Sequence, residues 1–275
     1  MLHTALSYPS RAERRRRVIA LHCSGCGASQ WSHLAEALGS AYTVLAPEQY
    51  GSEAAGPWPG DHAFALADEA ARIIALVDAS DEPVHLVGHS YGGGVALNVA
   101  LARPDRIAGM ALYEPTAFHL LKHLDAAGAA ALAEIGEVAG HMGRHVVVGD
   151  YRGAVAAFVD YWNGAGTWDG LNPRVQSALV RWAPKGPLDF HALVENPTPP
   201  AAFRTMRVPV LILRGERAPQ PTRLIADGLA ELLPLSRLSV IRGAGHMGPL
   251  THAAEVSAAI AWHIAAAGWH APAEP

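Results

Sequence analysis

A serine near the middle of the first half of the chain stands in a context that could activate it as a nucleophile. Gly88-His89-Ser90-Tyr91-Gly92 follows the apolar run Val84–Val87 and opens a helical stretch. A G-x-S-x-G pattern between a strand and a helix places its serine on a sharp turn at the tip of a sheet. The start of the helix adds a partial positive charge and free N–H groups beside the hydroxyl. A purely structural glycine turn is the alternative, and the strand–turn–helix context favours nucleophilic catalysis.

The base that such a serine needs is predicted to be His246. A serine hydroxyl is a weak nucleophile at neutral pH, so a neighbouring group must take its proton. His246 lies in a glycine-rich loop, Gly243–Gly248, between the last apolar run and the last helical stretch. His85, within a strand, and His33, on a helix, fit packing or surface roles instead. The sequence therefore predicts that Ser90 and His246 act together.

Acyl chemistry on a serine also needs donors that stabilise the negative oxygen of the tetrahedral intermediate. The backbone N–H of Tyr91 is one expected donor. The other should come from the loop that follows an earlier strand, and the run Val18–His22 leads into such a loop. There, Cys23 or Ser24 would supply a backbone N–H. The loss of one such donor costs about 10²–10³ in rate.

The elements that must position these residues are short apolar runs alternating with amphipathic helical stretches. This alternation indicates an α/β fold, with a mostly parallel central sheet and helices on both faces. One predicted helix is capped by Asp61, a second runs from Tyr91 to Ala102, and the last carries Val256, Ile260 and Ile264 on one face. Strands are predicted at Val18–His22, Tyr42–Ala46, Val84–Val87, Ile107–Tyr113, Val208–Leu213 and Leu238–Ile241.

Between the fourth and fifth predicted strands the chain changes character. It becomes rich in alanine and helical, and only His145–Val148 keeps a short strand signal. We interpret 116–205 as a helical cap inserted over a core formed by 1–115 and 206–275. Ordinary helical packing can explain any single aromatic residue of this stretch, but together they suggest the roof of an apolar pocket. They are Phe158, Tyr161, Trp162, Trp168 and Trp182.

Taken together, these segments resemble the α/β-hydrolase superfamily over nearly the whole chain. The first loop of that family usually reads His-Gly, and here it reads His22-Cys23. The tryptophan a few residues later is Trp31, and 47–51 (Pro-Glu-Gln-Tyr-Gly) resembles the family's Pro-Asp-x-x-Gly. The Gly-Ala-Gly-His loop that ends at His246 matches closely. The resemblance implies an α/β-hydrolase fold, and we expect the substrate pocket to be lined by His89, Trp31, Trp162 and Met247.

The acid that would orient the histidine departs from the family's usual pattern. Members of the family often place it after the penultimate strand in a Gly-x-x-Asp pattern, but here that position is Ala218. Some relatives instead carry it at the end of the strand beside the nucleophile strand, which is Glu114 in this chain. Since triads are recognised by role and not by position, Glu114 is favoured over Glu216. The absence of a working acid stays open as the third alternative.

The only two cysteines form a C-x-x-C pair, Cys23 and Cys26. A strand, C-x-x-C and helix is also a thioredoxin-like arrangement, and His22 adds a candidate metal ligand. A structural zinc site needs four ligands, however, and there is no second cysteine pair. A redox fold would also leave the Ser90 and His246 segments unexplained. We therefore expect neither a metal nor a cofactor.

Composition and charge limit the classes of partner that this protein is expected to bind. The net charge is −4, which argues against a nucleic-acid binder because such proteins carry a basic excess. No apolar run reaches the ~18 residues of a membrane helix. The basic segment Arg14–Arg17 is followed by too short an apolar run for a signal peptide, whose core needs ~7–15 residues. We expect a cytoplasmic protein without membrane or nucleic-acid partners, and a homodimer stays open.

These observations favour a serine hydrolase that cleaves a small carboxylic ester, or a related acyl compound with an apolar part, through an acyl-enzyme. The same residues could serve acyl transfer or carbon–carbon bond hydrolysis. A non-catalytic ligand-binding protein of this fold is a further alternative, since the usual acid position is alanine.

Overall fold

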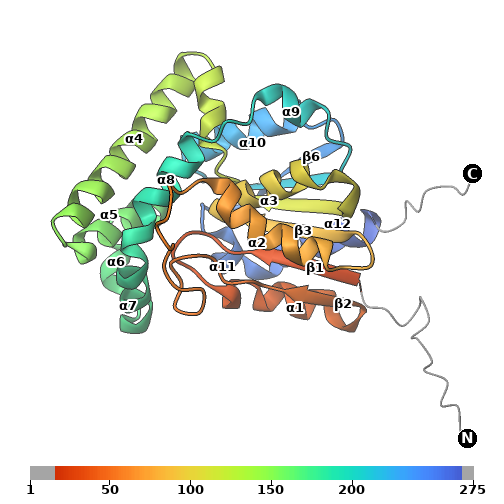
Figure 1. Cartoon of the computed structure of the whole chain (residues 1–275), viewed down its shortest axis with the longest axis horizontal. Coiled ribbons are helices and arrows are strands. Elements are labelled where there is room, and N and C mark those ends of the chain that lie inside the picture. The colour runs from red at the N-terminus through yellow and green to blue at the C-terminus, as the bar shows by residue number, and fades with distance from the viewer. Residues whose placement is uncertain (1–15, 268–275) are drawn as a thin grey trace, which may run out of the picture.

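The core of the molecule is a six-stranded parallel sheet, whose strands lie next to one another behind α2 and α3 in Figure 1. The computed structural model describes residues 16–267. The strand order is β2-β1-β3-β4-β5-β6, and every neighbouring pair is parallel. Parallel strands bring all their carboxyl ends to one edge, where the loops that follow them meet. The strands are β1 (Arg16–Leu21), β2 (Tyr42–Leu45), β3 (Val84–His89), β4 (Ile107–Tyr113), β5 (Val210–Gly215) and β6 (Ser236–Ile241).

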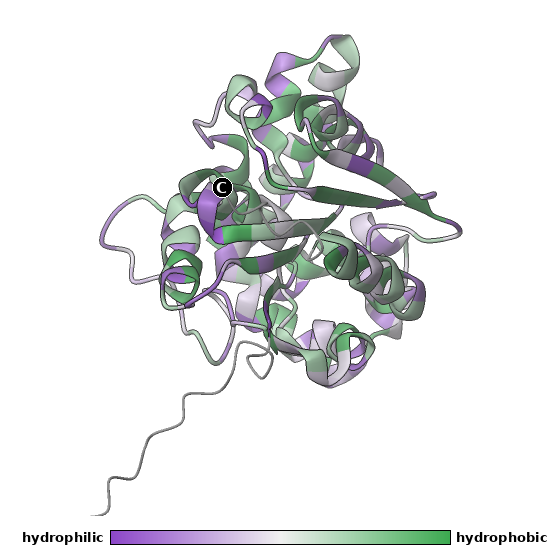
Figure 2. Ribbon diagram, turned by 90° about the vertical axis from the view of Figure 1, so that its right-hand side faces the viewer, coloured by the Kyte–Doolittle hydropathy of each residue, from purple (hydrophilic) through white to green (hydrophobic). Residues whose placement is uncertain are grey.

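Helices cover both faces of the sheet, as the run of alternating elements predicted. Helices α1 (Ser32–Leu38) and α12 (Ala253–Ala267) pack on one face, against alternate strand residues such as Val18 and Leu211. Helices α2 (Leu66–Asp78), α3 (Tyr91–Ala102) and α10 (Gln220–Leu232) cover the other. Because both faces are buried, the central strands read as continuous hydrophobic runs, the green strands of Figure 2.

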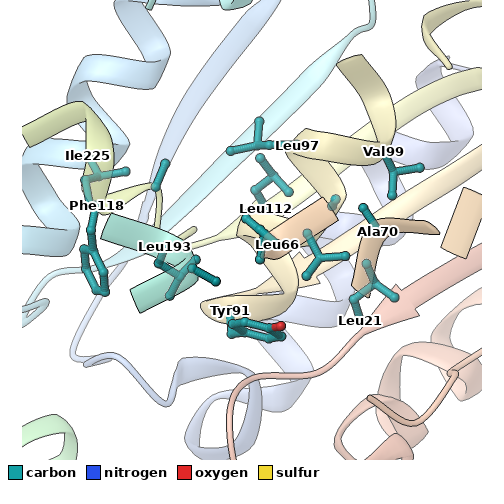
Figure 3. Packing of buried hydrophobic residues seen from close by; sticks show 14 of the residues in the cluster. Leu21, Leu66, Ala70, Tyr91, Leu97, Val99, Leu112, Phe118, Leu193 and Ile225 are labelled. Carbon is teal, nitrogen blue, oxygen red and sulfur yellow. The ribbon is translucent and has the colours of Figure 1, made fainter. Parts of the chain in front are cut away.

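Buried side chains from several elements pack around the start of α3 and fix its position on the sheet. Figure 3 shows Tyr91, at the start of α3, lying among Leu21, Leu66 and Leu193. These side chains come from β1, α2 and the segment between β4 and β5. The start of α3 is therefore in contact with the sheet, with a helix that covers it and with the segment between β4 and β5.

The segment between β4 and β5 is helical and lies to one side of the sheet in Figure 1. We refer to residues 116–205 as the cap. It packs on the core through α4 and α8, which contact α10, α2 and α3. After the short turn Phe118–His123, its helices are α4 (Ala126–Val147), α5 (Tyr151–Asn163), α6 (Thr167–Gly170), α7 (Pro173–Trp182), α8 (Gly186–Val194) and α9 (Pro200–Arg204).

Two local predictions were wrong. The stretch His145–Val148 is the end of α4 and not a strand, and Val147 and Val148 are exposed. Their β-branched side chains mimic a strand, but no neighbouring strand is there to pair with them. Helix α2 begins at Leu66, and its N-cap residue is Ala65 and not Asp61. The Asp68 carboxylate accepts a hydrogen bond from the N–H of Ala65 at 2.8 Å.

The basic segment of the sequence lies partly outside the described residues, which begin at Arg16. Within the described part of the chain, no helix is both long and apolar enough to cross a membrane.

Candidate active site

Ser90 occupies a strained turn between β3 and α3. Its φ is +53°, a value that non-glycine residues rarely adopt. A Cβ on Gly88 would lie 2.6 Å from the carbonyl oxygen of Gly92, and one on Gly92 would lie 2.4 Å from that of Leu21. The turn can be this tight only with glycine on both sides. It places the Ser90 hydroxyl at the carboxyl edge of the sheet, as the G-x-S-x-G pattern predicted.

Three side chains from three different loops meet at this edge. His246 Nε2 lies 3.0 Å from Ser90 Oγ, and His246 Nδ1 lies 2.7 Å from Glu114 Oε2. In the tautomer that satisfies both contacts, Nδ1–H donates to the carboxylate and Nε2 accepts from the hydroxyl. All three side chains are buried. In this arrangement the imidazole can take the proton of the serine hydroxyl, and the carboxylate orients the imidazole.

Glu114 is held in place by contacts that the sequence did not reveal. Its Oε1 accepts from the backbone N–H of Gly215 at 2.9 Å, and its Oε2 accepts from the Thr222 hydroxyl at 2.8 Å. The residue itself has φ +40°, which turns its side chain out of β4 toward β5. Nothing around Thr222 in the sequence signals this contact, because it depends on the start of α10 lying beside the residue that follows β4.

The competing carboxylate points elsewhere. Glu216 is exposed, and its Oε2 accepts from the backbone N–H of Gly243 at 2.8 Å. It therefore ties the end of β5 to the loop after β6 and does not reach the imidazole. Ala218, at the usual acid position, is buried.

The two predicted oxyanion donors differ from each other. The N–H of Tyr91 is at the first position of α3, where a helix offers no acceptor for it. The N–H of Cys23, in contrast, already donates to the Gln30 side chain at 3.2 Å. The prediction that Cys23 donates to an oxyanion is therefore wrong for this geometry, and Ser24 is the remaining candidate in that loop.

His89 supports the base and does not line a cavity. It is fully buried, and its Nε2–H donates to the carbonyl oxygen of His246 at 2.9 Å. Burial lowers the pKa of His89 well below its usual value, so the ring is neutral. The ring also packs edge-on against Tyr113, whose hydroxyl donates to the carbonyl of Gly245 at 2.7 Å. Both residues fix the backbone of the loop that carries His246.

Two other predicted pocket residues also lie elsewhere. Trp31 is buried on the face of the sheet covered by α1 and α12, packed among Val18 and Leu34. It belongs to the hydrophobic core because the turn before α1 carries it away from the strand edge. Met247 is half-buried, and neither cavity described below includes it in its lining.

Trp162 does lie at the site. Its ring stacks on the imidazole of His246 with centroids 4.1 Å apart and an interplanar angle of 29°. Phe158 contacts Trp162, Trp182 and Phe190, so the cap presents a continuous aromatic surface to the carboxyl edge of the sheet. Such a surface excludes water from the imidazole.

Two adjoining cavities lie between the cap and the loops. A small recess of about 20 Å³ is lined mainly by apolar residues, among them Phe118, Phe158, Trp162 and Phe190. A larger cavity of about 490 Å³ is lined by Ser24–Gly27, the loop 48–54 and α7. Ser24, Trp182 and Asp189 line both cavities. The larger one also reaches Tyr91, next to the serine.

A buried polar group forms one wall of these cavities. The Ser24 hydroxyl donates to Asp189 Oδ2 at 2.8 Å, and Lys185 Nζ pairs with the other Asp189 oxygen. Lys185 also lies 3.8 Å from Glu69, which accepts a hydrogen bond from the Tyr91 hydroxyl. Burial raises the pKa of Asp189, although Lys185 opposes that rise. Sequence reasoning missed this group, whose only signal was a charged pair four residues apart in an apolar part of the cap.

No group of three or more His, Cys, Asp or Glu side chains in 16–267 is arranged to hold a metal ion.

Comparisons with known proteins agree with this architecture. The chain is 36% identical to the lipase LipV of Mycobacterium tuberculosis over 102 residues, 36% of this chain and 37% of that protein. It is 33% identical over 115 residues to a 2-hydroxy-6-oxo-6-phenylhexa-2,4-dienoate hydrolase of Comamonas testosteroni, 40% of each. These matches span less than half the length of either relative.

Similarity over the full length comes from structure and from the family pattern. A thermophilic esterase from Thermogutta terrifontis, solved with malate bound, superposes with a TM-score of 0.68 over 92% of this chain and 90% of that chain, at 21% identity. The model of the Alpha/beta hydrolase family matches residues 18–259. The chain therefore belongs to the α/β-hydrolase family.

Proposed function

We propose that this chain is a serine hydrolase that cleaves a small carboxylic ester through an acyl-enzyme. The observation that carries the proposal is the pair of contacts at His246, 3.0 Å to Ser90 Oγ and 2.7 Å to Glu114 Oε2. Hydrogen-bond reach from nucleophile to base, and from base to orienting acid, is the geometric requirement for covalent catalysis by serine.

The first half of the reaction acylates the serine. Ser90 Oγ attacks the ester carbonyl carbon as its proton passes to His246 Nε2. Glu114 keeps the imidazole oriented and stabilises its positive charge. The backbone N–H groups of Tyr91 and Ser24 donate to the negative carbonyl oxygen. The C–O bond to the alcohol then breaks, and His246 returns the proton to the departing oxygen.

The second half removes the acyl group. Water takes the place of the alcohol, gives its proton to His246 and attacks the acyl carbon. Collapse of this second intermediate breaks the bond to Ser90 Oγ, and the hydroxyl regains its proton from the imidazole. The product is a carboxylic acid, and no cofactor takes part.

The cavities suggest how a substrate would be divided. The small aromatic recess beside Trp162 suits a short apolar acyl group, whereas the cavity of about 490 Å³ suits the larger alcohol part. Ser90 is only 6% exposed, so a substrate reaches it after the cap moves. That one relative is a lipase supports an ester as substrate.

Carbon–carbon bond hydrolysis is the second candidate. It is favoured by the similarity to the 2-hydroxy-6-oxo-6-phenylhexa-2,4-dienoate hydrolase, whose name states such a substrate. A screen of p-nitrophenyl esters of increasing acyl length, run beside a vinylogous 1,5-diketone acid, separates the two candidates. We expect the highest kcat/KM for short acyl esters. A substrate preference for the diketone would overturn the ester assignment.

Labelling with a fluorophosphonate probe tests the nucleophile directly, because the probe reacts only with an activated serine. We expect one label per chain, mapped to Ser90 by peptide mass. Ser90→Ala should abolish labelling, whereas Ser177→Ala, at an exposed position of the cap, should retain it. A label on another residue, or a folded wild-type protein that takes none, would contradict the proposal.

A further inference from the structure

The C-x-x-C pair lies in the loop that we assign to the oxyanion. Cys23 lies two residues after the end of β1, and the N–H of Cys26 donates to the carbonyl oxygen of Cys23 at 3.2 Å. Gly25, in the third position of this turn, has φ +73°. A turn of this kind brings its first and fourth Cα atoms within about 7 Å, a separation that a disulfide can span. Ser24 lies between the two cysteines.

The two thiols differ in exposure. Both are free, with Cys23 buried and Cys26 half-buried in the wall of the larger cavity. A hydrogen bond from Cys23 lowers the pKa of Cys26, with His22 adding to the effect and burial opposing it. The same contact raises the pKa of Cys23. A thiolate is the reactive form of cysteine, so Cys26 is the accessible nucleophile and Cys23 the buried partner.

We propose that Cys23 and Cys26 are a modification site, a dithiol that a small hydroperoxide converts into a reversible disulfide within the proposed oxyanion loop. The Cys26 thiolate attacks a peroxide oxygen, the O–O bond breaks, and water or an alcohol leaves, so that Cys26 becomes a sulfenic acid. The Cys23 thiol then attacks that sulfur. The S–O bond breaks as the S–S bond forms, and the Cys23 proton leaves with the oxygen as water. The dithiol loses two electrons to the peroxide, and a reducing thiol reverses the change.

The disulfide should act on the loop's backbone. Cys23 is buried and its N–H is bonded to Gln30, so bonding of the sulfurs displaces the Ser24–Cys26 side of the turn. That side has little room, because a Cβ on Gly25 would lie 2.6 Å from Leu179 of the cap. The Ser24 N–H therefore leaves the position from which it would meet an oxyanion. This effect on hydrolysis rests on the proposed function, whereas formation of the disulfide does not.

The experiment treats the full chain with hydrogen peroxide and follows intact mass, free thiols and ester hydrolysis in parallel. We expect loss of the mass of two hydrogen atoms, disappearance of both thiols, and hydrolysis about tenfold or more below the reduced protein, as for a displaced oxyanion donor. Dithiothreitol should restore all three. A chain that keeps its mass and thiols would overturn the inference. A disulfide-containing chain with unchanged hydrolysis would overturn its effect on the loop.

Two single variants test the order of the steps, each compared with its own reduced form. Cys23→Ser lacks the resolving thiol, so peroxide should leave Cys26 as a sulfenic acid that dimedone traps. Cys26→Ser should react much more slowly and form no disulfide. Trapping of Cys23 in the Cys26→Ser variant at the wild-type rate would reverse the assignment. A reduced protein that forms its disulfide but never hydrolyses an ester would contradict the proposed function alone.

Discussion

The carboxyl edge of the sheet and the cap position their residues by different means. At the sheet edge, backbone geometry positions the residues. Ser90 and Glu114 both have positive φ, the N–H of Gly215 holds Glu114, and the backbone carbonyl of His246 is held by the His89 ring. In the cap, side-chain packing positions the residues, through aromatic side chains such as Phe158 and Trp182 that contact one another at varied angles. A constellation fixed by backbone tolerates few substitutions, whereas a packed aromatic wall can change residue by residue. From this difference we expect the core to carry the proposed reaction and the cap to carry the substrate preference.

The largest effect is expected when the proposed nucleophile is removed. Ser90→Ala should lower kcat by about 10⁶-fold, as loss of the serine does in other triad enzymes. The turn is set by Gly88 and Gly92 and not by the hydroxyl, so the variant should unfold at nearly the wild-type temperature. Steady-state kinetics and a thermal melt measure the two quantities. A folded variant that keeps a tenth of the activity would mean that another residue attacks.

The carboxylate comes next. Glu114→Gln keeps the size of the side chain and removes the charge that stabilises the imidazolium, so kcat should fall by about 10⁴-fold. The matched control is Glu216→Gln, whose side chain only bonds the N–H of Gly243. It should keep kcat near the wild-type value. If Glu216→Gln is instead the crippled variant, the acid has been assigned to the wrong residue.

A second variant tests whether a carboxylate in the neighbouring loop can replace Glu114. The loop after β5 usually presents the acid in this family, and Ala218 stands in its place. Adding Ala218→Asp to Glu114→Gln should recover part of the lost kcat, because the new carboxylate can approach His246 from the neighbouring loop. No recovery in a folded double variant would mean that the loop of this chain no longer reaches the imidazole.

The sequence was informative where a local pattern determines a local geometry. The six strands, helix α3 and the turn at Ser90 follow from apolar runs and glycine spacing, and each was predicted within a few residues of its position. Contacts between distant segments were beyond such patterns. The Gln30 side chain that bonds the N–H of Cys23 had no signature. Trp31 was misplaced because a family position says nothing about which face of the sheet a turn exposes.

The substrate preference should depend on the cap. Phe190 lines the small recess and stacks on Phe118 with centroids 6.2 Å apart. Phe190→Ala enlarges the recess, so the ratio of kcat/KM for a hexanoyl ester to that for an acetyl ester should rise about 10-fold or more. The reaction itself should survive, with fluorophosphonate labelling of Ser90 retained. A variant that loses both labelling and hydrolysis would show that the cap does more than select.

A smaller effect is expected from the loop after β2, which supports the oxyanion loop. Glu48 has its pKa lowered from 4.5 to about 2 by the imidazole of His22, 3.6 Å away, with burial opposing and the N–H of Ala28 contributing. A lowered carboxyl pKa stabilises the fold above the unfolded value, and this stabilisation is lost as pH falls from about 4.5 toward 2. Wild-type Tm should therefore fall more steeply over this range than that of Glu48→Gln. Parallel slopes would mean that Glu48 is not coupled to folding.

The smallest effect should come from the ion pair that bridges cap and core. Arg181 of α7 lies 3.3 Å from Glu53, and the two side chains are 56% and 86% exposed. Water and salt screen such a pair, so its free energy should be about 0–1 kcal/mol. By contrast, Trp182 beside it is buried, and its ring lies 3.3 Å from where a Cβ on Gly25 would stand. The cap is therefore held by buried contacts, in which this apolar packing is joined by the Ser24–Asp189 hydrogen bond and the Lys185–Glu69 pair. A double-mutant cycle with Arg181→Gln and Glu53→Gln, measured by urea unfolding, should give a coupling energy within about 0.5 kcal/mol of zero that shrinks further with added salt. A coupling of several kcal/mol would mean that charge, and not aromatic packing, joins the cap to the core.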